Sequence, residues 1–330
     1  MRIFSGIQPT GAKHFGNFSG GFRQYASTQT MGESYFCVVD LHSITVDYDP
    51  VDLHARTLDL VAMLLATGID PERSVVFLQN HVPAHAEAAL LLAASTTFGE
   101  LRRMTQFKEK AETQALVSAA LFTYPVLMAA DVLLYQTDTV PIGDDQRQHL
   151  ELTRRIAERF NARFGATFSV PEGVIPDVGA RIMDLQDPAR KMSTTGGSEL
   201  GTLLILDPPD VVAKKIRSAV TDAGTEVRYE PSAKPGVSNL IEILHVATGE
   251  GIESIEGRYA GNGYGDFKRD VAEAVTELLE PVRERFREVR ADEANLRRVL
   301  AVGAERARAA SMPTLERMYE SMGFVRPTAP

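Results

Sequence analysis

Strand-type and helix-type segments alternate along the N-terminal part of the chain, and this alternation limits the possible folds more than any other feature. The strand-type segments are Arg2–Ser5, Tyr35–Val39 and Ser74–Leu78, and the helix-type segments are Phe15–Thr28, Pro50–Ala66 and Ala84–Ala94. Repeated units of this kind build α/β domains with a doubly wound parallel sheet. Ligands of such sheets bind at the carboxyl ends of the strands, where His14, Asp40, His42 and Gln79 are expected to lie.

The later part of the chain has a different pattern. We predict a mostly apolar helix over Ala115–Tyr135, interrupted at Pro125, then a strand at Val140–Ile142, a helix ending near Asn161 and an irregular connection over Phe164–Arg181. Strand-type segments stop near Asp184, and further helices are predicted at Pro208–Val220, Asn239–Thr248, Asp266–Val289 and Asp292–Met322. The sequence therefore predicts a helical domain near residues 185–292 after the α/β domain.

Composition narrows the class of protein. With 330 residues, 44% of them hydrophobic, the chain can bury a sizeable core. Its net charge of −9 excludes a uniformly basic coat for nucleic acid, although a local basic patch is compatible with it. Cys37 is the only cysteine, which excludes a disulfide framework and a cysteine-based zinc or iron–sulfur site. No signal-peptide pattern and no bilayer-spanning apolar run is visible, so we expect a cytoplasmic protein.

The tetrapeptide His14-Phe15-Gly16-Asn17 follows the first predicted strand. Phosphates bind to helix N-termini, backbone N–H groups and cationic or polar side chains. Gly16 would let the backbone lie close to an adenosine, and His14 and Asn17 can donate to phosphate oxygens. The alternative interpretation is a turn that merely precedes a helix.

A second segment, Lys191-Met192-Ser193-Thr194-Thr195, lies far downstream in a glycine-rich loop. Lys191 is a point charge suited to pyrophosphate, and the hydroxyl groups after it add donors. Lys108 and Lys110 are candidates for a second cationic arm. An ordinary surface loop and a solvated charged face are the alternatives for these two segments.

In combination with further blocks, these segments resemble the bacterial type of the tryptophanyl-tRNA synthetase family, which is a class I aminoacyl-tRNA synthetase family. The resemblance covers nearly the whole chain, from Ser5 to about Gly323. The blocks that carry it are Ser5–Gly11 with the His14–Asn17 signature, Met104–Lys110, Tyr124–Asp131, Gly143–Gln146 with His149, and the Lys191–Thr195 loop.

The resemblance implies a Rossmann-type catalytic domain with a dimer interface over residues 1–184. It also implies a helical anticodon-binding domain over residues 185–292 and a C-terminal helix over residues 293–330 that returns to the catalytic domain. The implied ligase activates L-tryptophan with ATP to tryptophanyl-adenylate and pyrophosphate, and then transfers the tryptophanyl group to the 3′ end of tRNA(Trp). The implied partners are L-tryptophan, ATP, tRNA(Trp) and a second copy of the chain in a homodimer, with no membrane and no DNA.

Adenylate formation needs alignment and charge neutralisation more than a side-chain nucleophile. By resemblance, the catalytic residues are His14, Asn17, Lys110, Lys191 and Ser193. The implied ATP contacts are Gln8, Pro9, Thr10, His14, Gly16, Asn17, Gly143, Asp144, Asp145, Arg181, Ile182, Lys191, Met192, Ser193 and Thr194. Mg²⁺ is expected to be held mainly by the ATP phosphates, with no metal site on the protein and no prosthetic group.

Tyr124, Met128 and Asp131 follow i, i+4, i+7 spacing, so they share one helix face. By resemblance this face lines the tryptophan pocket, and Asp131 accepts the indole N–H. The remaining tryptophan contacts implied are Phe4, Ile142 and His42 around the ring, and Gln8, Gln146 and Tyr124 at the polar end. The alternative is a core face with a capping aspartate. A buried carboxylate left without its donor costs about 2–5 kcal/mol, so phenylalanine should be rejected strongly.

Thr194 departs from the family's common Lys-Met-Ser-Lys-Ser signature, because it stands where the second lysine would be. The missing charge-assisted contact is worth about 1.5–3 kcal/mol. We expect Lys110, Lys191 and Mg²⁺ to carry more of the pyrophosphate charge.

For tRNA, the best candidate stretch is Pro281–Ala310, which is rich in arginine and partly neutralised by acidic residues. A solvated helix with ion pairs is the alternative interpretation of this stretch.

Three other functions compete with the tryptophan interpretation. A tyrosyl-tRNA synthetase would usually have Gln at the position of Met128, because a phenol hydroxyl needs extra polar partners. A catalytically weak relative with a regulatory or tRNA-binding role would be expected to lose ATP contacts, yet only Thr194 departs. A nucleotidyltransferase acting on another small acid would lack the helical domain and the Gly143–Gln146 block.

Overall fold

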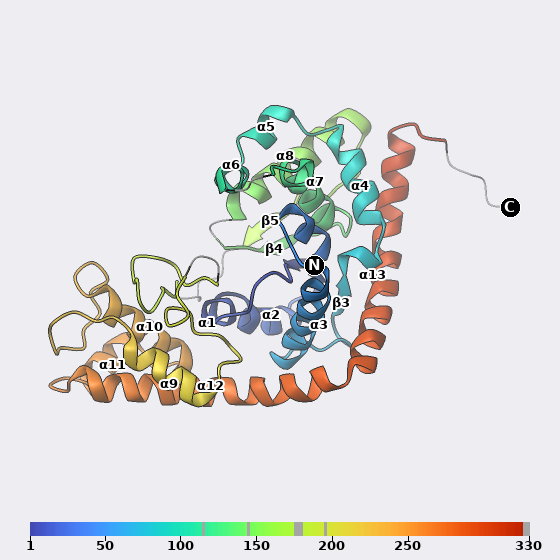
Figure 1. The fold of residues 1–330 in the computed structure, drawn as a ribbon. Helices are drawn as coiled ribbons and strands as arrows, with labels where there is room; N and C mark the ends of the chain where they lie inside the picture. Colours follow the sequence, from blue (N-terminus) through green and yellow to red (C-terminus); the bar gives the residue numbers. More distant parts are fainter. Residues whose placement is uncertain (114–115, 144–145, 175–180, 195–196, 326–330) are drawn as a thin grey trace.

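The computed structural model describes residues 1–113, 116–143, 146–174, 181–194 and 197–325 (Figure 1). Its sheet has five strands in the order β3-β2-β1-β4-β5, and every pair is parallel. The strands are β1 (Arg2–Ile7), β2 (Glu33–Val38), β3 (Val75–Leu78), β4 (Thr139–Pro141) and β5 (Glu172–Val174). The predicted doubly wound parallel sheet is thus confirmed. Its order reverses between β1 and β4, which is the switch point where such sheets bind ligands.

Both faces of the sheet are buried, because successive side chains of one strand point to opposite sides. In β2, Phe36 and Val38 belong to one hydrophobic core, whereas Tyr35 and Cys37 belong to the other. The first core includes α3 (Pro50–Ala66), and the second includes α4 (Ala84–Ala93), α7 (Ala119–Leu133) and α8 (Arg147–Phe164).

Three details of the first half differ from the sequence prediction. The segment 164–181 was expected to be irregular, but it contains β5, whose residues are all exposed and therefore leave no apolar pattern. The helix around Pro125 is continuous rather than interrupted, since proline removes one hydrogen bond without necessarily ending a helix. The predicted helix Phe15–Thr28 is divided into α1 (Phe15–Asn17), a π-helical turn η1 (Phe18–Phe22) and α2 (Arg23–Thr28).

Short helices connect the strands of the α/β part. A 3₁₀ turn η2 (Asp40–Thr45) follows β2, and another, η3 (Gln79–His81), follows β3. Two further helices, α5 (Phe98–Arg102) and α6 (Thr105–Thr113), precede α7.

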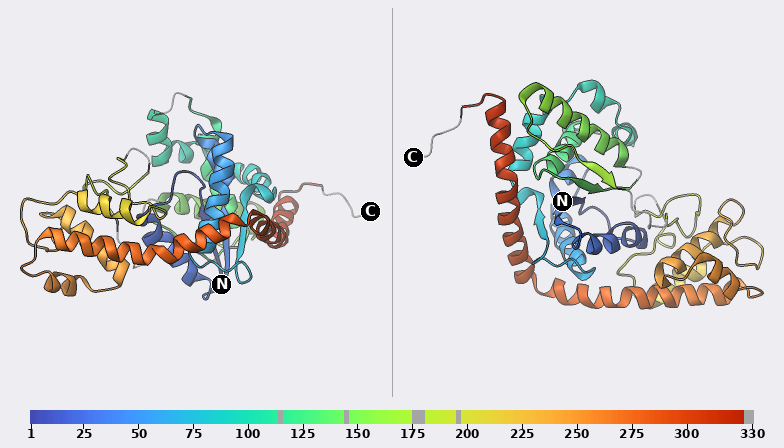
Figure 2. Two further views of the ribbon diagram at one scale, coloured as in Figure 1. Left: turned by 60° about the horizontal axis from the view of Figure 1, so that its bottom comes forward. Right: turned by 180° about the vertical axis from the view of Figure 1, so that it is seen from behind.

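After β5, the regular elements of the described residues are all helices. Its helices are α9 (Pro209–Ser218), α10 (Pro235–Thr248), α11 (Ile252–Arg258), α12 (Tyr264–Ala291) and α13 (Glu293–Ser321). The short helix α11 was not predicted from sequence. The two long helices α12 and α13 meet at a sharp corner and form an L, and the α/β part lies inside its angle (Figure 1 and the right view of Figure 2).

Helix α13 lies along β3, which is an edge strand of the sheet (Figure 1). At the closest approach stands Gly303, where an added Cβ would overlap the Val76 carbonyl oxygen. Nearby, the Arg306 guanidinium donates to the Ser74 carbonyl oxygen at 2.9 Å. The helix therefore covers the strand edge and binds backbone groups there. No described helix is apolar over a stretch long enough to span a bilayer.

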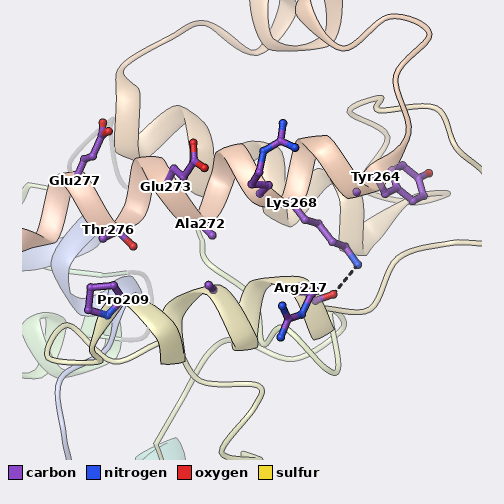
Figure 3. A pocket seen from close by; sticks show the side chains of 11 residues that line it. Pro209, Arg217, Tyr264, Lys268, Ala272, Glu273, Thr276 and Glu277 are labelled. Atoms are coloured by element: carbon purple, nitrogen blue, oxygen red, sulfur yellow. Dashed lines mark hydrogen bonds between the residues drawn. The ribbon is translucent and has the colours of Figure 1, made fainter.

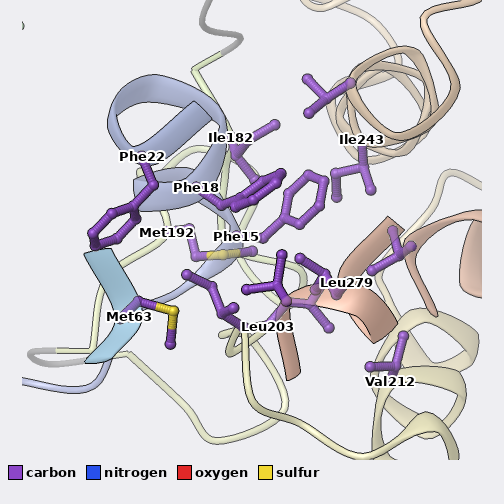
Figure 4. Packing of buried hydrophobic residues seen from close by; sticks show 14 of the residues in the cluster. Phe15, Phe18, Phe22, Met63, Ile182, Met192, Leu203, Val212, Ile243 and Leu279 are labelled. Carbon is purple, nitrogen blue, oxygen red and sulfur yellow. The ribbon is translucent and has the colours of Figure 1, made fainter. Parts of the chain in front are cut away.

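A continuous apolar core joins the α/β part to the helical part (Figure 4). It contains Phe15 from the first helix, Met192 and Leu203 from the loop region, Ile243 from α10 and Leu279 from α12. The described residues of the loop region thus pack against both parts.

Candidate active site

The two nucleotide-type segments meet in the structure. The Phe15 amide donates to the Leu203 carbonyl at 2.8 Å, and the Ile205 amide donates to the Lys13 carbonyl at 3.0 Å. Gly11 has a φ of +68°, and a Cβ there would lie 2.7 Å from Thr194 Oγ1. The segment around His14 therefore lies beside the loop that carries Lys191 and Thr194.

His14 and Asn17 form a compact N-terminal turn of α1, in which the His14 amide donates to Asn17 Oδ1 at 3.0 Å. This leaves the Asn17 amide nitrogen as a donor. His14 is buried, and its Nδ1 has no hydrogen-bond partner among the described residues. Burial, with smaller contributions from Lys13 and Lys191, lowers the pKa of His14 to about 4. The imidazole is therefore neutral near pH 7. Gly16 packs against it, since an added Cβ would lie 3.1 Å from the His14 ring.

The lowered pKa of His14 predicts a pH-dependent stability. The folded-state pKa of about 4 is below the ordinary 6.5, so the unfolded chain binds more protons between these values. The free energy of unfolding should fall as the pH falls from 6.5 to 4. We expect His14→Gln to remove up to about 3 kcal/mol of this dependence. Urea unfolding of the wild-type protein and of His14→Gln at pH 7 and pH 4.5 measures this dependence. An equal fall in the free energy of unfolding in the two proteins would contradict the prediction.

The loop with the second segment is held by its own backbone. The Met192 amide donates to the Ile182 carbonyl at 3.0 Å, and Met183 and Lys191 form an antiparallel bridge. The side chains of Ile182 and Met192 are each 1% exposed and face the core (Figure 4). They position the loop, whereas Lys191 and Thr194 are exposed beside His14. The Ser193 carbonyl accepts a hydrogen bond from Thr202 Oγ1 at 2.8 Å.

The turn after β1 is fixed by a residue that the sequence did not single out. Lys13 Nζ donates to the carbonyls of Gln8 and Thr10, at 2.8 Å and 3.0 Å. Burial, assisted by Arg56, lowers the pKa of Lys13 to about 8. Gln8 itself is exposed, and Pro9 is buried.

The other expected ATP contacts lie on different elements. Gly143 is exposed after β4, and the Gln146 amide donates to the Gly143 carbonyl at 3.0 Å just before α8. Lys110 is half-buried near the end of α6, where burial lowers its pKa. Arg181 is exposed. Asp144, Asp145 and Thr195 lie outside the described residues.

Asp131 is the centre of a buried polar cluster on α7 and is 2% exposed. Its Oδ1 accepts hydrogen bonds from Gln79 Nε2 at 2.6 Å and from His85 Nδ1 at 2.7 Å, and its Oδ2 is 2.9 Å from His42 Nε2. Burial alone would raise the pKa of Asp131, but the hydrogen bonds from His42 and His85 outweigh it and lower the pKa. The group is thus an ionised carboxylate with three donors.

Aromatic and apolar side chains surround this cluster. Phe4 and Ile142 are both buried, and the ring centroids of His42 and Tyr124 are 6.4 Å apart. The Tyr124 hydroxyl lies 2.6 Å from His149 Nε2, and Met128 is half-buried. The site combines four separate segments. Tyr124 and Asp131 lie on one face of α7, and they are joined by Phe4 of β1, His42 after β2 and Ile142 after β4.

Two members of the cluster were not proposed as site residues. Gln79 was expected at a strand end, but its bond to Asp131 follows from tertiary packing. His85 stands alone in an apolar helix, and no spacing signal marked it. Asp40 has a structural role that the sequence left open, since its carboxylate binds the backbone amide and the side chain of Asn80 and so joins η2 to η3.

A pocket of about 630 Å³ lies away from these groups, between α9 and α12 (Figure 3). Its lysine, Lys268, points toward the end of α9, where Nζ donates to the carbonyls of Ala219 at 2.8 Å and Arg217 at 3.3 Å. This cation therefore binds the last backbone carbonyls of α9. Buried polar side chains converge at the carboxyl ends of the strands instead, so that region is the better candidate for the active site.

Known proteins share this architecture. The sequence matches the family model of class I tRNA synthetases for tryptophan and tyrosine over residues 1–280. The tryptophan–tRNA ligase of Mycobacterium leprae is 51% identical over 98% of this chain and 96% of the relative, and that of Listeria monocytogenes is 50% identical over 98% of each. Among solved structures, tryptophanyl-tRNA synthetase from Mycoplasma pneumoniae has a TM-score of 0.91 at 36% identity, covering 98% of both chains. The Campylobacter jejuni enzyme complexed with ADP and tryptophan has a TM-score of 0.86 at 32% identity, covering 98% of this chain and 100% of that one.

Proposed function

The chain belongs to the tryptophanyl-tRNA synthetase family of class I synthetases and is a tryptophan–tRNA ligase, and from this premise we propose which of its residues perform each step. The enzyme activates L-tryptophan with ATP to tryptophanyl-adenylate and pyrophosphate, and then transfers the tryptophanyl group to tRNA(Trp). The observation that carries the residue assignment is the buried Asp131 carboxylate beside Phe4, His42 and Tyr124.

Asp131 recognises the indole N–H. An ionised carboxylate has about four acceptor positions, and Gln79, His85 and His42 use three of them. One position therefore remains for a substrate donor. Phe4 and Ile142 lie against the ring, and Tyr124, Gln146 and Gln8 bind the ammonium and carboxylate groups. A phenylalanine side chain has no donor for Asp131, so it is rejected.

His14, Asn17, Lys110, Lys191 and Ser193 align ATP for in-line attack by the tryptophan carboxylate on the α-phosphorus. Pyrophosphate leaves as the new acyl–phosphate bond forms. The proximity of neutral His14 to Lys191 supports this assignment, because it combines a hydrogen-bonding group with a positive charge where a phosphate chain needs both. Magnesium bound to the ATP phosphates supplies further positive charge.

Amino-acid-dependent ATP–pyrophosphate exchange across all twenty amino acids tests the assignment. Exchange with tryptophan alone is expected. Exchange with tyrosine would mean that the pocket has been misread. Absence of exchange with every amino acid would favour the regulatory role and would make Thr194 the first residue to examine.

Thr194→Lys tests how the pyrophosphate charge is shared. Thr194 lies against Gly11 on the surface of the loop, so a longer side chain can extend toward solvent and phosphate. We expect the adenylation rate to rise by about tenfold or more, as a charge-assisted hydrogen bond would allow, and its magnesium dependence to weaken. Rates measured across a magnesium titration decide the matter, and Thr194→Ser serves as the uncharged control. Unchanged rate and magnesium dependence would refute the idea that Lys110, Lys191 and magnesium compensate.

We propose that tRNA binds to the exposed arginines of the stretch that joins α12 and α13. Several arginines of that stretch already bind protein groups: Arg283 donates to the Asp207 carbonyl, Arg290 to Asp59, Arg306 to the Ser74 carbonyl and Arg308 to the His81 carbonyl. Arg285, Arg287, Arg297 and Arg298 are exposed and are the better candidates, although their nearest partners are residues of the same helix region.

We propose that the chain forms a homodimer through the catalytic half. Leu90, Phe98 and Leu116 are 76%, 68% and 79% exposed, and exposed large apolar side chains of this kind are typical of protein interfaces. The domain division at residues 184 and 292 is likewise proposed, with α9–α12 forming the anticodon-binding part and α13 returning to the sheet. A cytoplasmic location is proposed from the family.

A further inference from the structure

A chain of fully buried hydrogen bonds runs from the Asp131 carboxylate through His85 to Tyr135, which lies beside the C-terminal helix α13. His85 Nδ1 is 2.7 Å from Asp131 Oδ1, and His85 Nε2 is 2.9 Å from the Tyr135 hydroxyl. Tyr135 lies beside Ser311 of α13, whose Oγ donates to the Arg308 carbonyl oxygen at 3.3 Å. His85, Tyr135 and Ser311 are each 0% exposed. Neither His85 nor Tyr135 contacts ATP or tryptophan in the proposed function.

The order of hydrogens along this chain follows from the chemistry of its ends. An ionised Asp131 only accepts, so the His85 Nδ1 must carry a hydrogen. In a neutral imidazole the other nitrogen is then an acceptor, and Tyr135 must donate its hydroxyl hydrogen to it. The ionised Asp131 therefore selects the tautomer in which His85 donates to it, and the Tyr135 hydroxyl stabilises that tautomer by donating to Nε2.

Tyr135 also supports the neighbouring wall. Its ring stacks on Phe4, with centroids 5.5 Å apart and planes inclined by 21°, and it lies 5.6 Å from the His85 ring. The ring of Phe77 also packs against the His85 ring, and their centroids are 5.9 Å apart. Packing of this kind holds the His85 ring in one orientation.

We propose that His85 is a positioning residue for tryptophan recognition: with its tautomer stabilised by Tyr135, it orients the Asp131 carboxylate so that the remaining acceptor position of the carboxylate faces the indole N–H. This inference rests on the proposed function of Asp131. Loss of the His85 bond frees the carboxylate to rotate, and the penalty falls on substrates that must donate to it. A substrate without an N–H donor has no such bond to lose.

The test compares tryptophan with benzothienylalanine, in which sulfur replaces the indole N–H at similar ring shape. The readout is the ratio of kcat/KM for the two amino acids in ATP–pyrophosphate exchange. Wild-type protein should favour tryptophan strongly. We expect His85→Leu to lower this ratio by about tenfold or more, the loss of one hydrogen bond to a charged group. His85→Asn should recover part of it, since the amide N–H can replace Nδ1–H.

Tyr135→Phe provides a gentler variant, because it removes one oxygen and keeps the stacking on Phe4. It should lower the ratio in the same direction. Tyr35→Phe is the matched control: Tyr35 lies in the same core, 4.8 Å from the Tyr135 ring, but its hydroxyl binds Glu33. It should leave the ratio unchanged.

The outcomes distinguish failure of the His85 role from failure of the Asp131 role. If both amino acids lose activity equally in Tyr135→Phe, or if neither does, the ratio is unchanged and the positioning role of His85 is overturned. This holds even where His85→Leu does not fold. If wild-type protein fails to distinguish tryptophan from benzothienylalanine, the proposed role of Asp131 itself is wrong.

Discussion

Asp131→Ala should lower kcat/KM for tryptophan by about two to three orders of magnitude, while the KM for ATP changes little. The substitution removes the acceptor of the indole N–H. It also leaves donors of Gln79, His85 and His42 buried without their partner. Donors stranded in this way cost more than the lost bond itself.

Steady-state exchange kinetics, with each substrate varied in turn, measure this effect. Glu151→Ala is a suitable control, because Glu151 is an exposed carboxylate on α8 that forms an ion pair with Arg155 of the same helix. Thermal unfolding of both variants separates loss of recognition from loss of fold. A proportional loss of affinity for ATP and tryptophan would contradict the assigned role of Asp131.

Lys191→Ala should lower the rate of adenylate formation by about a hundredfold or more, with little change in the KM for tryptophan. Lys191 is exposed, and its charge reaches His14 strongly enough to help lower the pKa of that imidazole. A positive charge at this place stabilises the negative charge that gathers on pyrophosphate as it leaves. Its contribution is therefore greatest in the transition state.

Single-turnover measurements of adenylate formation are the direct assay for this variant. Lys214→Ala on α9 is the control, since Lys214 is another exposed lysine outside the proposed site. Fold stability should be the same in both variants. A change in tryptophan KM without a change in the rate would place Lys191 in amino acid binding instead.

The parts of the fold that could be predicted are those with a strong local pattern. Strand β2 and helix α3 could be predicted from local patterns. A strand covered on both faces is continuously apolar, and an amphipathic helix has apolar residues at regular intervals. Strand β5 was not readable, because its three residues are exposed and it exists only through pairing with β4.

The same distinction applies to the site. Tyr124, Met128 and Asp131 belong to one helix, so their common face follows from spacing alone. His85 reaches Asp131 because α4 packs against α7, and a contact of this kind between separate helices leaves no mark on the sequence of either. Lys13 could not be predicted for the same reason. Its ammonium group donates to two backbone carbonyls of a turn, and no sequence pattern specifies that geometry.

The covering of β3 by α13 has a consequence for the chain as it is made. An uncovered edge strand is a template for pairing with another chain. Synthesis delivers Val75–Leu78 well before Glu293–Ser321, and domains begin to fold from the N-terminus as they emerge. The nascent sheet therefore passes through a stage with an open edge on the ribosome. Emergence of α13, rather than completion of the sheet, is the event that closes this edge against neighbouring polypeptides.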